Sequence, residues 1–109
     1  MTIGIYSFEL HIPLARSLKA KRQVVRRVKD RLRSRYNVSV SEIDEFGDLW
    51  QRAGIMVVAV ATHRDALERL FESVHHEAAS HVPGQLIETG TEYIEAADGG
   101  PSGWTGDWS

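Results

Sequence analysis

Residues 2–12 alternate between apolar and other side chains in the way that a β-strand with one buried face requires. One parity carries Tyr6, Phe8, Leu10 and Ile12, and the second half of the other carries Ser7, Glu9 and His11. Ile3 and Ile5 belong to this second parity, so we expect the first half of that face to be covered as well. Pro13 ends the strand, because proline has no amide hydrogen to donate.

From residue 18 the apolar period becomes that of an amphipathic helix. At 100° per residue its inner stripe contains Leu18, Val25, Val28, Leu32 and Tyr36, with Val24 at the edge. Ser17 is a suitable N-cap for this helix. Lys21 points into the apolar stripe, where Glu42, Asp44 or a helix-end carbonyl are candidate partners. The simpler interpretation is that its ammonium group snorkels past the first turn to solvent.

A strand pair follows the helix. Residues 38–44 resemble a short strand, and Phe46-Gly47-Asp48 is the expected hairpin connection. A third strand runs to Thr62. Its centre, residues 55–61, is apolar on both parities, which is typical of a strand in the middle of a sheet.

A second helix and a last strand complete the chain. Thr62-His63-Arg64-Asp65 has the spacing of a capping box at the helix start. The inner face of the helix is expected to contain Leu67, Leu70, Phe71, Val74 and Ala78. Pro83-Gly84 ends this segment, and residues 86–96 form a fourth strand in which Gly90 introduces a bulge.

The order βαββαβ, with right-handed crossovers, predicts an α+β fold. Its four-stranded antiparallel sheet carries both helices on one face, as in a ferredoxin-like sandwich. We expect one domain over residues 1–97 and a flexible Gly/Trp-containing tail over residues 98–109. Trp104 and Trp108 leave two interpretations of the tail open: a tolerated terminus, or a docking peptide for a partner or a neighbouring subunit.

Charge is distributed very unevenly along the chain. Residues 16–35 contain ten of the thirteen cations and one acid, a charge of +9, whereas the remainder has three cations and fourteen acids, a charge of −11. Such asymmetry favours a polyanionic partner. The chain has no cysteine, no signal-peptide pattern at its start and no long apolar run, so we expect a cytoplasmic protein without a membrane association.

Three motifs together resemble the YlxP-like family of small bacterial proteins. They are His11-Ile12-Pro13 with residues 17–22 (SLKAKR), residues 36–42 (YNVSVSE) and residues 48–53 (DLWQRA). The resemblance covers about residues 1–97 and implies a ferredoxin-like fold, but no established catalytic residues. It also implies a role near ribosome assembly or translation, because genes of this family often lie near those for translation initiation factor two and ribosome-binding factor A.

The basic helix is the principal candidate for function. One flank presents Lys19, Arg22, Arg26, Lys29 and Arg33, and the other presents Arg27, Arg31 and Arg35. A stripe of flexible cations about three turns long fits the phosphates of a structured, possibly ribosomal, RNA. The alternative is a solvated helix face that pairs with the protein's own acids. Base stacking on the sheet face is disfavoured, because the exposed positions there include Glu9 rather than aromatic residues.

Trp50 and Arg52 form a second candidate, a partner-binding patch, since both residue types are enriched at binding hot spots. Equally, Trp50 covers one end of the core while Arg52 pairs with Asp44, Glu45 or Asp48. A competing class of function is a protein-interaction module or homo-oligomer without nucleic acid. Exposed strand edges, the two-faced apolar start of the first strand and the acidic remainder of the chain against the basic helix are all compatible with it.

Enzymatic and metal-dependent functions have weaker support. His75, His76 and His81 are close in sequence, but His76 and His81 project about 140° apart on an ideal helix, so we expect no metal and no other cofactor. An acylphosphatase-like site would use Arg16 and Asn37, but the loop after the first strand lacks the glycines of a phosphate cradle. We therefore expect a noncatalytic protein.

Overall fold

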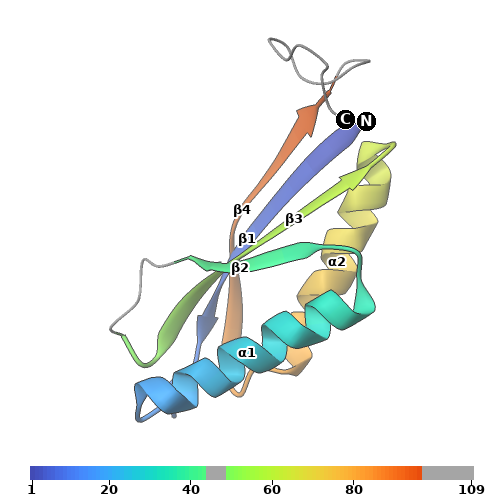
Figure 1. Ribbon diagram of the computed structural model, residues 1–109. Coiled ribbons are helices and arrows are strands. Elements are labelled where there is room, and N and C mark those ends of the chain that lie inside the picture. Colours follow the sequence, from blue (N-terminus) through green and yellow to red (C-terminus); the bar gives the residue numbers. More distant parts are fainter. Residues whose placement is uncertain (44–48, 97–109) are drawn as a thin grey trace, which may run out of the picture.

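The computed structural model describes residues 1–43 and 49–96 of the chain. Its elements, in order, are β1 (Thr2–His11), α1 (Leu18–Arg35), β2 (Ser39–Ile43), β3 (Arg52–Ala61), α2 (Arg64–Ser80) and β4 (Gln85–Glu95) (Figure 1). The predicted hairpin connection at residues 46–48 and the predicted tail at residues 98–109 lie outside the described residues, as do Asp44 and Glu45.

The four strands form one antiparallel sheet in the order β2-β3-β1-β4, with both helices against one face (Figure 1). This arrangement is the ferredoxin-like α+β fold that the sequence predicts. The predicted bulge in β4 is confirmed: Ser7 pairs with Gly90 while Phe8 pairs with Glu88, so Thr89 is the extra residue.

The core lies between the sheet and the two helices. On β1, every second residue from Thr2 to Leu10 is buried, so the strand turns the apolar parity toward the helices. The helices supply Val24, Val25, Val28 and Leu32 from α1 and Leu67, Phe71, Val74 and Ala78 from α2. Phe71 stacks on Tyr6, with 5.3 Å between the ring centroids, which joins α2 to the centre of the sheet.

The two helices begin differently. Ser17 is the N-cap of α1, and its Oγ accepts a hydrogen bond from the Ala20 amide at 3.0 Å, as predicted. The predicted capping box at Thr62 is wrong, because the N-cap of α2 is His63 and its side chain makes no capping bond. Asp65 therefore lies in the first turn rather than at the N3 position, and its negative charge still interacts favourably with the positive end of the helix dipole.

No helix of the described chain covers the second face of the sheet. Ile3 and Ile5 on β1 are half-buried and lie between the neighbouring strands β3 and β4. Ile3 pairs with Val60 of β3 on one side and with Ile94 of β4 on the other. Val60 remains 60% exposed and Ile94 42% exposed. The expectation that this half of the face is covered is therefore met only in part. Neither described helix is long and apolar enough to span a membrane.

Candidate nucleic-acid interface

Helix α1 presents its cations on both sides of a buried apolar stripe. Val24, Val25, Val28 and Leu32 turn inward, so the intervening positions must face solvent or a neighbouring element. Because a helix turns 100° per residue, the cations separate into the two flanks that the sequence predicts. The structure gives these flanks different surroundings.

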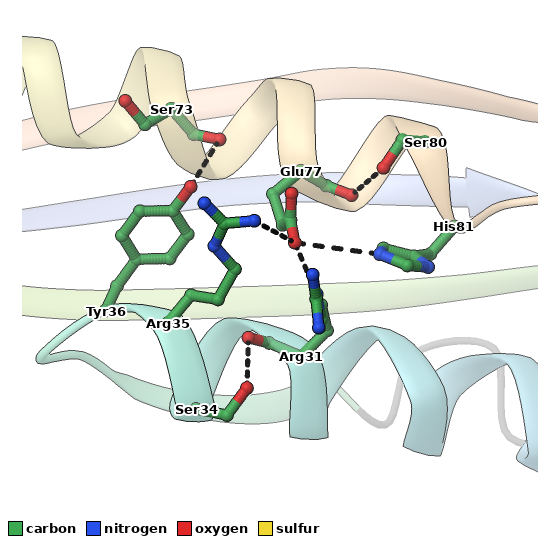
Figure 2. A network of polar contacts seen from close by, with 8 residues as sticks. All are labelled: Arg31, Ser34, Arg35, Tyr36, Ser73, Glu77, Ser80 and His81. Carbon is green, nitrogen blue, oxygen red and sulfur yellow. Dashed lines mark hydrogen bonds and ion pairs between the residues drawn. The ribbon is translucent and has the colours of Figure 1, made fainter.

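The flank that carries Arg27, Arg31 and Arg35 faces helix α2. Glu77 of α2 accepts a hydrogen bond from Arg31 Nε at 2.5 Å and a longer one from Arg35 at 3.4 Å, and it lies 3.6 Å from Nε2 of His81 (Figure 2). Arg31 and then Arg35 hold the pKa of this carboxyl below its usual value against the opposing effect of desolvation. Arg31 and Arg35 are thus engaged within the protein. Arg27, on the same flank, is exposed and has no carboxylate partner in the described ranges.

The other flank, which begins at Lys19 and ends at Arg33, borders a groove between α1 and the edge strand β2. The groove has a volume of about 400 Å³, and its lining consists of Arg22, Val25, Arg26, Lys29, Asp30, Arg33 and Glu42. Arg33 donates a hydrogen bond to the Val40 carbonyl at 2.6 Å and so bridges the helix to β2. Across residues 1–43 and 49–96, Arg22, Arg26 and Lys29 form no ion pair. Three cations therefore face one groove, and no acid among the described residues contacts them closely enough to form an ion pair.

Lys19 is exposed one turn before this groove, on the flank where the sequence predicts it. Lys21 is not part of the basic surface. It is 3% exposed, and its Nζ donates a hydrogen bond to the Leu49 carbonyl at 2.8 Å. The interpretation that Lys21 snorkels to solvent is wrong, because its side chain is buried and its ammonium group bonds to Leu49, which lies three residues before β3.

A family model described as "Protein of unknown function (DUF503)" matches residues 3–91. The chain belongs to this family. It is 39% identical over 72 residues to "Uncharacterized protein YlxP" of Bacillus subtilis (strain 168), an alignment that covers 66% of this chain and 77% of that protein. The YlxP-like resemblance is therefore confirmed.

Among solved structures, this DUF503 protein is similar to a C-terminal segment of the alpha subunit of aIF2 from Pyrococcus abyssi, with a TM-score of 0.51 and 19% identity. The likeness covers 83% of this chain and 51% of that one, so the chain spans about half the length of that structure. At this identity it supports the fold.

The two residues of the predicted partner patch at the start of β3 have different surroundings. Trp50 is 49% exposed, so it does not simply close the end of the core. Arg52 donates hydrogen bonds to both carboxylate oxygens of Glu9, at 2.9 and 3.1 Å, on the helix-free face of the sheet. His11 and then Arg52 hold the pKa of Glu9 below its usual value. Glu9 was not among the expected partners, since pairing across β1 and β3 depends on a register that a single sequence does not give.

Two of the three histidines considered as metal ligands lie beside different acids: His75 lies near Glu88 and His81 near Glu77. His75 Nδ1 lies 3.0 Å from the Tyr6 hydroxyl, which in turn donates to Glu88 of β4 at 2.8 Å. His81 lies instead beside Glu77. Over the described residues, no three His, Cys, Asp or Glu side chains gather closely enough to hold a metal ion. Burial, followed by the Glu88 contact, raises the pKa of Tyr6 far above its usual value, so this phenol stays protonated.

Proposed function

We propose that this protein is a noncatalytic RNA-binding protein that holds the phosphates of a structured RNA in the groove between α1 and β2. The observation that carries the proposal is that Arg22, Arg26 and Lys29 line one groove and none of them forms an ion pair with a described carboxylate. Cations that pair with the protein's own acids, such as Arg31 and Arg35, would have to lose those contacts before they bound phosphate.

Lys19 and Arg33 extend the contact surface along the helix, and Arg27 can meet a backbone that curves around it. The arrangement suits recognition by shape and charge, because the described lining of the groove offers flexible cations and includes no aromatic side chain for base stacking. Ribosomal RNA is the first candidate ligand, because the YlxP-like resemblance implies a role near ribosome assembly or translation.

Charge reversal in the groove tests the proposal. We expect the double variant Arg22→Glu/Arg26→Glu to lower affinity for a fluorescently labelled RNA hairpin at least about tenfold, and addition of Lys29→Glu to abolish binding. The matched control is Arg64→Glu/Arg69→Glu on α2, which changes the net charge equally at exposed arginines outside the groove. Equal losses in the two double variants would show that net charge alone, not the groove, governs binding.

Salt dependence supplies a second readout of the same proposal. If about four phosphates are neutralised, affinity falls on the order of a hundredfold between 50 and 200 mM salt. The groove variants are expected to flatten this dependence, because each lost phosphate contact removes about one released counterion. Salt-insensitive binding by the folded wild-type protein would contradict the proposal.

A protein-interaction module or homo-oligomer is the second candidate function. It is favoured by the apolar residues that the helix-free face leaves exposed, among them Met56, Val60 and Ile94, and by half-exposed Leu49 and Trp50. Light scattering of the RNA-free protein distinguishes the candidates. A mass that rises with concentration, together with no RNA affinity, would favour the module.

A further inference from the structure

The groove between α1 and β2 contains acids as well as cations. Asp30 and Glu42 line it beside Arg22, Arg26 and Lys29, both are exposed, and neither forms an ion pair with any described residue. A carboxylate is repelled by bound phosphates and cannot donate a hydrogen bond to them, because an ionised carboxylate has acceptors and no donor. A site for simple phosphate gains nothing from such a group.

The two acids differ in position. Asp30 lies on α1 itself, one turn from Arg26 and Arg33, where it moderates the charge of its own helix. Glu42 comes from the facing wall of the groove. It is opposite Ile55 in the register of β2 and β3, and because Ile55 is buried, the Glu42 side chain lies on the helix side of the sheet. The groove therefore has a cationic wall on α1 and an acceptor on β2.

The bridge from Arg33 to the Val40 carbonyl fixes this geometry. Val40 and Glu42 share one face of β2, so the hydrogen bond at 2.6 Å ties the helix to the strand two residues from the acid. A ligand that fits both walls must carry anionic groups and hydrogen-bond donors side by side along its length. The RNA backbone does so, because a 2′-hydroxyl accompanies every phosphate and can donate as well as accept.

We propose that Glu42 accepts a hydrogen bond from a ribose 2′-hydroxyl and thereby makes the α1–β2 groove select RNA over DNA. This inference rests on the proposed function and names Glu42 as the specificity-determining residue of the same site. In DNA the donor is missing, so the carboxylate faces phosphates without compensation. Selectivity thus comes from one stabilising contact with RNA and one repulsive contact with DNA.

The test compares two hairpins of one sequence, one of RNA and one carrying 2′-fluoro groups throughout the stem. The fluoro hairpin keeps the phosphates and A-form geometry but cannot donate from the 2′ position. For the full-length wild-type protein, fluorescence anisotropy is expected to show at least about fivefold tighter binding to the RNA hairpin. In Glu42→Ala this ratio is expected to fall close to one, with affinity for the fluoro hairpin raised.

Asp30→Ala is the matched control, since it removes the same charge from the same groove and is expected to keep the wild-type ratio. Glu42→Gln retains an acceptor and is expected to give an intermediate ratio. Tighter binding of both hairpins by Glu42→Ala, with the ratio unchanged, would overturn the selectivity proposal and leave RNA binding intact. Failure of the wild-type protein to bind either hairpin would overturn the proposed function itself.

Discussion

Single contacts decide several features that residue type alone does not reveal. Gly84, in the turn between α2 and β4, shows this most clearly. A Cβ atom built on it would lie 2.0 Å from the His11 carbonyl oxygen and 3.1 Å from Pro13. The backbone of β1 and this turn therefore approach each other so closely that a side chain at this position requires the backbone to move.

Replacement Gly84→Ala is accordingly expected to lower the free energy of unfolding by about 2 kcal/mol, which is typical of overpacking against rigid backbone. Gly90→Ala provides the control, because a Cβ at Gly90 meets no atom within 4 Å. Urea unfolding followed by circular dichroism measures both variants. Similar stability of the two would mean that the turn shifts freely, which the close approach to His11 argues against.

Elements depend on one another through a few polar contacts, and the principal contact of this kind between the helices is centred on Glu77. The Glu77 side chain is 13% exposed and accepts hydrogen bonds from Arg31 and Arg35, so it ties the last turns of α1 to α2 (Figure 2). Tyr36 reinforces the junction by donating from its hydroxyl to the Ser73 carbonyl at 3.3 Å (Figure 2).

This junction predicts a pH dependence. The pKa of Glu77 is lower in the folded than in the unfolded protein, so its contribution to stability is present above the unfolded value and is lost as pH falls through the folded one. We expect Glu77→Gln to lower the urea midpoint at pH 7, by an amount that shrinks toward pH 3 as the wild-type carboxyl takes up a proton. A constant difference at both pH values would assign the effect to packing. Exposed Glu72→Gln, on the same helix, is the control.

At the scale of elements, sequence patterns predicted most of what is observed. Alternation placed Tyr6, Phe8 and Leu10 in the core, and the Ser17 cap is formed as expected. The start of α2 was predicted one residue too early, because Thr62-His63-Arg64-Asp65 satisfies a capping-box spacing equally well whether or not the chain uses it.

At the scale of the whole molecule, the sequence predicted the polarised charge and its division between two helix flanks. It did not predict which flank forms ion pairs with α2 and which lines a groove. The difference depends on Glu77, which lies 46 residues after Arg31 and approaches it only when both helices pack on the sheet. The position of Glu42, the acid on the β2 wall of the groove, likewise depends on the pairing of β2 with β3. Long-range contacts of this kind require the tertiary fold.

The cations of the groove, which form no ion pair with a described acid, repel one another, and the effect on the stability of the fold can be measured. Arg22 and Arg26 lie one turn apart on α1, as do Arg26 and Lys29, and like charges at this spacing destabilise a helix by a few tenths of a kcal/mol per pair. If these residues are retained for binding, stability and function should oppose each other here.

We therefore expect Arg26→Gln to raise the free energy of unfolding by about 0.5 kcal/mol at low salt while it weakens RNA binding. The gain should shrink at high salt, where the repulsion is screened, and wild-type stability should rise correspondingly. Arg31→Gln is the comparison, since Arg31 bonds to Glu77 and its loss should destabilise the protein at low salt. Urea unfolding at both salt concentrations measures this. If Arg26→Gln destabilised the protein as Arg31→Gln does, Arg26 would belong to the structural framework, and the groove would lose its central cation as evidence for a ligand.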